Sequence, residues 1–226
     1  KGFEEIVSRL AGCAEGDIYL NDGDLLLSGF TECADSSDIL FRSKSFSAGS
    51  SDTYKILPAI TILFETVLLP ERAIGESITS QKTDSTAKLA WLLKGYIGEE
   101  ITRAYLNIKE DTSPASPLII YELRNREAAE SLFTEYLKNN SGSESKKENE
   151  SITWFQPDDQ TRIPVYSTPF KGLISFLVPG FAADVSDSLF AFYDNFMITS
   201  DSYSAITRLL YDNMLHKTLA NDLIYS

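Results

Sequence analysis

Histidine and cysteine are scarce in this sequence, which contains one His and two Cys among 226 residues. His216 alone cannot form a multi-histidine metal site, and two cysteines do not make a metal site by themselves. A Ser–His–acid triad would have to use His216, which follows a predicted helix. Its simpler interpretation is an exposed side chain whose charge is favourable near a helix C-terminus. We therefore predict no catalytic histidine, no metal site and no cofactor.

Positive charge is also in short supply. The chain has 20 Lys and Arg against 33 Asp and Glu, which gives a formal net charge of −13. Nucleic acids and anionic membrane surfaces would repel such a chain, so neither is expected as a partner. The excess of acids is better explained by solubility than by a dedicated cationic partner.

The sequence has no long apolar run. None approaches the roughly 20 residues that a transmembrane helix needs. The chain starts at Lys1 without a signal peptide, and Asp222–Ser226 resembles the opening of a further element. We therefore expect a fragment of a longer protein, in which a targeting or anchoring segment lies outside these residues.

Motifs that carry chemistry are missing too. There is no G-x-x-x-x-G-K-[ST] phosphate loop, no G-x-G-x-x-G, no G-x-S-x-G and no H-E-x-x-H. Glu99 and Glu100 adjoin a predicted strand, so their side chains should point to opposite faces and cannot work as a glycosidase pair. The pair Asp158-Asp159 follows Pro157 and is typical of a turn. Asp22-Gly23-Asp24 lacks the downstream spacing of a calcium loop. No catalytic, cofactor-binding or metal-ligating residue is predicted.

The chain does contain enough apolar residues for a substantial core. Hydrophobic residues make up 43% of the sequence, with 13 Phe, 11 Tyr and 2 Trp. The length suits a single domain over residues 1–226, or two intimately packed halves with a division near the polar residues 139–150. Aromatic residues crowd the last third; most should be core, and a minority on one exposed sheet face could form an interaction patch.

The most informative stretch is Leu118 to Leu137. Leu118–Leu123 is typical of a strand, Asn125 offers a helix N-cap, and apolar residues then recur at helical spacing. The same plan returns 77 positions later as strand 196–199, a cap at Ser200 or Asp201, and helix 202–214. Each helix should lie across a shared sheet, since neither can bury its apolar stripe alone. The likeness indicates either a duplication or two strand–helix units that align by period.

The remaining pattern predicts an α+β fold. Strand 59–66 should be buried on both faces or nearly so, and residues 31–52 form a polar connection of the kind that is often functional or mobile. The other expected strands cover 17–20, 25–30, 100–109, 118–123, 151–156, 163–168, 173–178 and 189–193, and the other helices cover 2–11, 85–96 and 126–138. Short turns join many neighbouring strands, so we expect largely antiparallel sheet with the helices packed on one face.

The two cysteines flank the first predicted hairpin. If its turn is a three-residue loop centred on Gly23, Leu20 faces Leu26 and, by extension, Cys13 faces Cys33. A facing pair can be bridged in an oxidising compartment. Two free, partly buried thiols explain the same residues equally well.

Several short signatures occur together along the chain. They are Asp24-Leu25-Leu26-Leu27-Ser28-Gly29-Phe30, Leu57-Pro58, Ile97-Gly98-Glu99-Glu100, Ile163-Pro164-Val165-Tyr166, Tyr193-Asp194-Asn195-Phe196-Met197-Ile198-Thr199-Ser200 and Lys217-Thr218-Leu219-Ala220-Asn221-Asp222. In this order the chain resembles a family of uncharacterised bacterial cell-envelope proteins known only as a domain of unknown function. The resemblance implies an exported, membrane-tethered protein, located in the periplasm or at the cell surface. It implies no catalytic residue.

These observations favour a non-catalytic, extracytoplasmic module that binds or scaffolds protein components of the bacterial cell envelope. One alternative is a hydrolase that uses carboxylates brought together by the fold. Three or more titratable groups converging in one deep pocket would favour that enzyme. A second alternative is a domain that binds a small apolar molecule between sheet and helices. The sequence does not indicate the oligomeric state.

Overall fold

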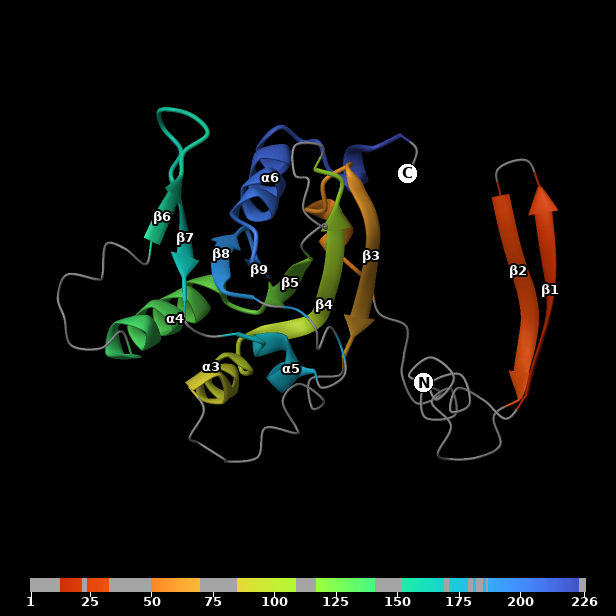
Figure 1. Cartoon of the computed structure of the whole chain (residues 1–226), viewed down its shortest axis with the longest axis horizontal. Coiled ribbons are helices and arrows are strands. Elements are labelled where there is room, and N and C mark those ends of the chain that lie inside the picture. The colour runs from red at the N-terminus through yellow and green to blue at the C-terminus, as the bar shows by residue number, and fades with distance from the viewer. Residues whose placement is uncertain are drawn as a thin grey trace. The chain divides into compact units, whose positions relative to one another are not determined.

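The computed structural model describes residues 13–21, 24–32, 50–69, 85–108, 117–140, 152–168, 171–178, 181, 185 and 187–223. The chain divides into two compact units, residues 1–49 and residues 50–226 (Figure 1). The helix expected over 2–11, most of the polar connection over 31–52, and Cys33 lie outside the described residues. No helix among the described residues is both long and apolar enough to span a membrane.

The first unit contains a β-hairpin made of β1 (Cys13–Asn21) and β2 (Asp24–Glu32). Its register pairs Leu20 with Leu25 and Asn21 with Asp24, which leaves two residues for the turn. The predicted three-residue loop is therefore wrong, because Asp-Gly at the tip suits a two-residue turn. The one-residue change places Cys13 opposite Glu32, where it is exposed and free.

The second unit is organised around one antiparallel sheet of seven strands, in the order β3-β4-β5-β9-β8-β7-β6. The strands are β3 (Thr61–Leu68), β4 (Ile97–Leu106), β5 (Leu118–Leu123), β6 (Ile152–Phe155), β7 (Ile163–Ser167), β8 (Leu189–Tyr193) and β9 (Phe196–Ser200). The helices are α3 (Ser85–Leu93), α4 (Arg126–Asn140), α5 (Leu173–Leu177) and α6 (Tyr203–Met214), with short 3-10 turns η1 (Thr53–Lys55) and η2 (Leu219–Asn221). The α+β class and the antiparallel sheet are confirmed. Strands that precede residues 139–150 and strands that follow them belong to this one sheet.

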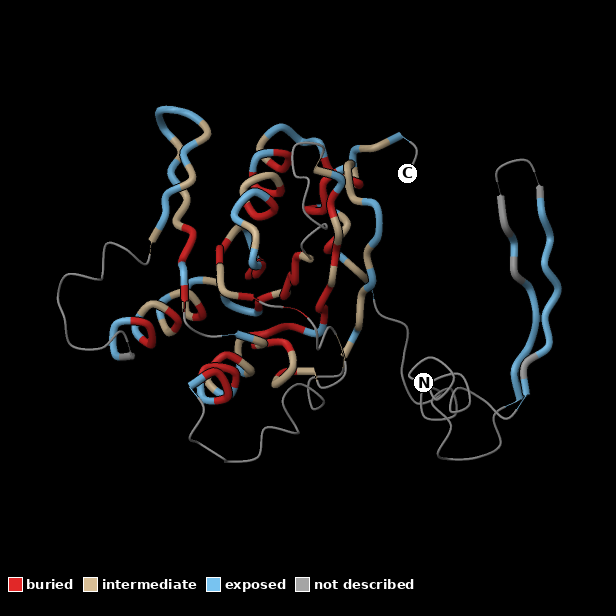
Figure 2. Tube along the Cα trace, in the orientation of Figure 1, coloured by how far each residue is buried: buried red, intermediate tan, exposed pale blue. Residues whose placement is uncertain are grey.

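Helices cover both faces of the sheet, which corrects the expectation that they pack on one face. Side chains alternate along β5, so Ile119 and Tyr121 join a core with α3, α4 and α5, whereas Leu118 and Ile120 join a second core with α6. A central strand that is apolar on both faces has to be covered twice. Figure 2 shows the resulting buried stretches inside the unit, with exposed residues on its loops and edges.

The two strand–helix units adopt the predicted local structure. The Asn125 Oδ1 accepts a hydrogen bond from the Ala128 N–H at 3.0 Å, and the Ser202 Oγ accepts one from the Ala205 N–H at 3.2 Å. The second cap is therefore Ser202, and the expectation of Ser200 or Asp201 is corrected. The Ser200 Oγ instead accepts a hydrogen bond from the N–H of Ser202, the residue before α6.

The likeness between β5–α4 and β9–α6 does not extend to the strands beside them. Strands β5 and β9 are antiparallel neighbours, and their helices lie on opposite faces. In the sheet, β4 lies on the outer side of β5 and β8 on the outer side of β9. A rotation that superposes β5–α4 on β9–α6 would instead place β4 on the side of β9 that faces β5. The rotation that relates the two strand–helix units therefore does not relate their neighbouring strands β4 and β8.

Two elements differ from the sequence prediction because tertiary context decides them. Strand β3 is an edge strand rather than a buried one, and Ile62 and Leu63 are 63% and 60% exposed. The predicted strand 173–178 is the short helix α5. Its first N–H groups, on Gly172 and Leu173, donate to the buried carboxylate of Asp187.

The hairpin of the first unit offers a test of its register. A Cβ on Gly29 would clash with the backbone oxygen of Glu15, whereas a Cβ on Gly16 would lie 3.4 Å from the nearest atom. Because an isolated two-stranded hairpin is only marginally stable, we expect Gly29→Ala to abolish the pairing and Gly16→Ala to retain it. Cross-strand proton NOEs between Tyr19 and Leu26 measure the outcome. Equal NOEs in both variants would contradict the close approach.

Candidate functional site

A groove runs along α6, the helix that covers one face of the sheet. It consists of two adjoining hollows of about 530 and 580 Å³ that share Ile60 and Arg208. The charged hollow is lined at the end of α6 and around η2 by Ala59, Ile60, Arg208, Asp212, His216, Lys217, Thr218, Asn221, Asp222 and Leu223. The apolar hollow is lined by Ile60, Asn107, Ile108, Phe155, Ser204, Thr207, Arg208 and Tyr211. We call the two together the α6 groove.

The C-terminal cap of α6 builds one end of this groove. The N–H of His216 donates to the carbonyl of Asn213 at 3.0 Å, and the N–H of Lys217 donates to the carbonyl of Asp212 at 2.8 Å. This is the Schellman arrangement, whose central residue adopts left-handed backbone and is usually glycine. Here that residue is His216, with φ 53°. The only histidine of the sequence thus occupies a conformation that glycine adopts more easily.

The next residues close the groove against the start of β3. The Lys217 carbonyl accepts from the Ala59 N–H at 2.9 Å, and Pro58 and Thr218 form an isolated β-bridge. Inside the helix, the Asn213 side-chain amide donates to the Ile56 carbonyl at 2.6 Å. Two signatures that lie far apart in sequence, Leu57-Pro58 and the one beginning at Lys217, are therefore in direct contact.

Charged side chains converge in the charged hollow. Asp212 is 1% exposed, and its Oδ2 accepts from the Arg208 Nε at 2.7 Å, while its buried Oδ1 has no hydrogen-bond partner among the described residues. His216 and Lys217 are exposed at the rim and have no acidic partner among the residues described. Sequence reasoning assigned His216 to an exposed helix end, as observed, and missed the others. The spacing of 208, 212 and 216 by four was the available signal.

Two threonine hydroxyls that line the groove are hydrogen-bonded within the chain. The Thr207 hydroxyl donates to helix carbonyls, and the Thr218 hydroxyl accepts from Asn221. Within the described part of the chain, neither hydroxyl contacts His216, and no group of three or more His, Cys, Asp or Glu could hold a metal ion. The titratable groups do converge, but in a surface groove without an activated nucleophile.

The acids considered from sequence have structural roles. Glu99 is exposed and Glu100 is buried, so their predicted opposite orientation is confirmed. The Glu100 carboxylate accepts hydrogen bonds from the Ser51 and Thr53 hydroxyls and from the backbone N–H groups of Asp52 and Thr53. Glu100 therefore anchors the chain at the start of η1, and its carboxylate is occupied by these four donors.

The turn acids also differ in what they contact. The Asp158 Oδ1 accepts from the N–H groups of Gln160 and Thr161 at 2.8 and 2.7 Å, and these bonds hold the pKa of that carboxyl below its usual value. Asp159 is exposed in the same turn. Asp24 opens β2 opposite Asn21, and Asp22 lies outside the described residues.

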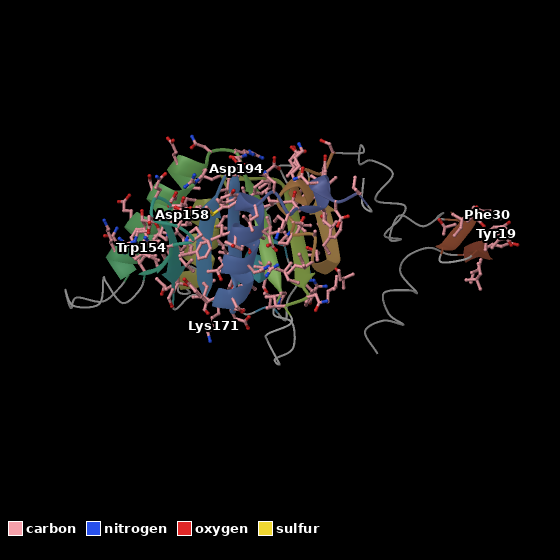
Figure 3. All side chains as sticks on the ribbon, turned by 90° about the horizontal axis from the view of Figure 1, so that it is seen from above. Tyr19, Phe30, Trp154, Asp158, Lys171 and Asp194 are labelled. Carbon is pink, nitrogen blue, oxygen red and sulfur yellow. The ribbon has the colours of Figure 1, made fainter. Side chains whose placement is uncertain are left out.

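The aromatic residues divide as predicted into a core majority and an exposed minority. Phe133 of α4 packs against the rings of Tyr166, Phe190 and Phe192 at centroid distances of 4.9 to 5.5 Å. Trp154, Tyr203 and Tyr211 are 44%, 38% and 43% exposed. Trp154 lies near Asp158 (Figure 3), and the Cζ of Arg162 stacks over the Trp154 ring, 4.4 Å from its centroid. The Tyr203 hydroxyl donates to the Trp154 carbonyl at 3.4 Å, and of these three rings Tyr211 lines the groove.

A buried polar cluster lies on the opposite face. The Tyr121 hydroxyl, the Thr199 hydroxyl and the Asp187 Oδ2 are all buried without a well-formed hydrogen bond among the described residues. Burial raises the pKa of Asp187 to about 6, and the N–H groups of Gly172 and Leu173 offset only part of that effect. Burial and the nearby charge of Asp187 raise the pKa of Tyr121 well above its usual value. The cluster has no described opening and belongs to the core.

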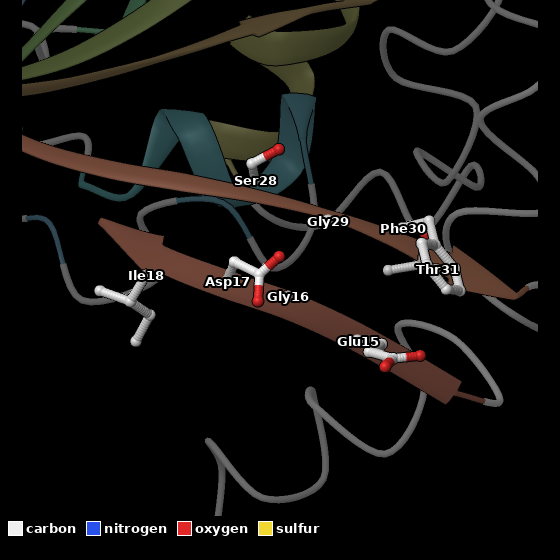
Figure 4. A pocket seen from close by; sticks show the side chains of 8 residues that line it. All are labelled: Glu15, Gly16, Asp17, Ile18, Ser28, Gly29, Phe30 and Thr31. Carbon is white, nitrogen blue, oxygen red and sulfur yellow. The ribbon is translucent and has the colours of Figure 1, made fainter.

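The hairpin of the first unit also has a hollow, formed around the facing pair Gly16 and Gly29 (Figure 4). Glu15, Asp17 and Phe30 are among its lining residues. It has no buried polar side chain, and a two-stranded ribbon supplies only one wall. We therefore treat the α6 groove as the candidate functional site.

Asp187 makes stability depend on pH. Its pKa is higher in the folded protein than the usual 3.8, so the fold favours the protonated acid. Its stabilising contribution is complete below about pH 4 and is lost as the pH rises through about 6. We expect the wild type to lose about 2 kcal/mol relative to Asp187→Asn between pH 4 and pH 8, measured by urea unfolding. Asp158→Asn is the control, because its lowered pKa predicts the opposite sign.

The backbone of His216 predicts a second effect. Replacing a left-handed residue with glycine removes a conformational penalty, so His216→Gly should stabilise the protein by about 1 kcal/mol in urea unfolding. Leu215→Gly is the control, since Leu215 has φ −88° and gains nothing from glycine. A loss of stability in His216→Gly would show that imidazole contacts outweigh the backbone term.

Comparisons with known proteins found no match, whether to a family model, a curated protein or a solved structure. The geometry and charge of the α6 groove are therefore the basis for a functional proposal.

Proposed function

We propose that this protein is a non-catalytic binding module whose α6 groove holds an extended segment of a partner protein. The observation that supports it is the adjoining charged and apolar hollows, which meet at Ile60 and Arg208. An elongated site with apolar side chains along it and polar groups at one end suits an extended peptide. Tyr211 is the exposed aromatic anchor in the apolar hollow.

Binding is better supported than hydrolysis. Of the five titratable groups in the charged hollow, Asp212 is already held by Arg208 at 2.7 Å. No described hydroxyl in the groove is paired with a base, and Glu100 is occupied by the segment before η1. A general base needs to reach the proton that it removes, and no such pair is present among these residues.

A place in the bacterial cell envelope, outside the cytoplasm, belongs to the same proposal. It depends on the resemblance carried by the short signatures of the sequence. Two of these signatures, Leu57-Pro58 and the one beginning at Lys217, build one end of the groove together.

A random peptide library displayed on phage tests the groove. We expect selected peptides to bind the wild-type chain and to lose about tenfold in affinity against Ile60→Ser and against Tyr211→Ala, since both remove apolar contact area. Fluorescence polarisation measures the affinities. Trp91→Ala is the matched control, because Trp91 is a 52% exposed aromatic residue on α3, which packs on the opposite face.

Two outcomes would contradict the proposal. One is a set of peptides whose affinity is unaffected by both groove variants. The other is turnover of an ester or glycan panel by the wild type that disappears in Asp212→Asn, which would assign the groove to an enzyme.

A further inference from the structure

We infer that the charged hollow binds a carboxylate, and that the segment held in the α6 groove is a peptide end with apolar side chains and a free C-terminal carboxylate. This inference rests on the proposed function, because it names the chemistry of the partner in the same groove. It is carried by the charges that remain uncommitted there and by the backbone of His216.

Each acid of the charged hollow already has a partner, although the buried Asp212 Oδ1 is without one among the described residues. Asp212 is buried, and its negative charge is balanced by the Arg208 guanidinium at 2.7 Å. Asp222 also has an interaction partner. His216 and Lys217, by contrast, are exposed at the rim with no acidic partner among the described residues. The charged group left to meet a ligand is therefore the Lys217 ammonium, with the His216 imidazole beside it, on a chain whose net charge is −13.

The backbone of His216 is an independent observation. At φ 53° the chain pays a conformational penalty that glycine would avoid. A strained residue is tolerated where the surrounding structure or a function holds it, and here the strain keeps an imidazole at the rim beside Lys217. The bonds of this cap are backbone bonds, which a glycine would also form.

The apolar hollow specifies what precedes the carboxylate. It begins at Ile60 and Arg208, where the charged hollow ends, and continues over Ile108, Phe155 and Tyr211. With a terminal carboxylate at His216 and Lys217, the preceding side chains of an extended peptide lie over these apolar residues. If the acid were an internal side chain, the peptide would continue on both sides of Lys217. The groove supplies apolar lining on only one side of that residue.

The test compares each selected groove-binding peptide as the C-terminal acid and as the C-terminal amide, against the full chain. We expect the amide to bind about tenfold more weakly, because it loses the negative charge that meets Lys217 and His216 at the rim. Lys217→Met keeps the apolar stem and removes the charge, so it should weaken the acid form about threefold and leave the amide form unchanged. His216→Gly should act in the same way. Added salt should narrow the difference between acid and amide.

Lys171→Met is the matched control. Lys171 is an exposed lysine just before α5, a helix whose buried residues belong to the core on the opposite face of the sheet. It should leave both peptide forms unchanged.

The outcomes separate this inference from the proposed function. If acid and amide peptides bind equally while Ile60→Ser still weakens both, the groove binds peptides and the carboxylate assignment is wrong. Peptides that need an internal Glu, and lose affinity as Gln, would overturn the C-terminal assignment in favour of an acidic side chain. If no peptide depends on the groove residues, both proposals fail.

Discussion

Burial of the two central strands on both of their faces is the constraint on which the second unit depends. Leu118, Ile119 and Ile120 of β5 are all fully buried, and so are Met197 and Ile198 of β9. Each fully buried Leu, Ile or Met side chain contributes about 1.5–3 kcal/mol relative to an exposed one. That gain requires cover on both faces, so α3, α4 and α5 close one and α6 closes the other. The chain reaches this arrangement by crossing from β5 through α4 to the far edge and returning along β6, β7 and β8 to β9.

The groove follows from this two-sided packing. Helix α6 packs mainly on β8 and β9, near the centre of the sheet, and the chain must then turn back toward the start of β3. The Schellman cap makes that turn, and the bridge between Pro58 and Thr218 holds it. Beside α6, the ends of β3, β4 and β6 carry apolar side chains that this single helix does not cover. The concavity lies where α6, η2 and those strand ends meet.

Local patterns made much of this fold predictable from sequence. Strand Leu118–Leu123, the Asn125 cap and the hairpin across Asp194-Asn195 follow from β-branched runs, side-chain acceptors and turn residues, each decided within a few positions. The failures depend on distant partners. Strand β3 is apolar enough for a central strand of the sheet, but it has a neighbouring strand on one side only. Segment 173–178 is helical, and the carboxylate of Asp187 accepts hydrogen bonds from the first N–H groups of that helix. The placement of helices on both faces was also missed, since alternation along β5 shows two apolar faces without showing which helix covers each.

The site was harder to predict because its walls come from separate parts of the chain. Ile60, Phe155 and Tyr211 belong to three elements, and no spacing in the sequence brings them together. Arg208, Asp212 and His216 do share a helical spacing, but the sequence does not show that His216 leaves the helix in left-handed backbone. Catalytic motifs also do not describe this groove, whose side chains are suited to contact.

Three buried carboxylates differ in whether a ligand could reach them, and only the one in the groove is accessible through its partner. Glu100 has four donors and is saturated by its own chain. Asp187 has donors on one oxygen, and its other oxygen lies in a closed core with Tyr121 and Thr199. Asp212 is also half satisfied, but its partner Arg208 is 42% exposed and lines both hollows. An ion pair with one partner at a solvent-filled surface can exchange contacts with a ligand without opening the core, and neither of the other two acids has that freedom.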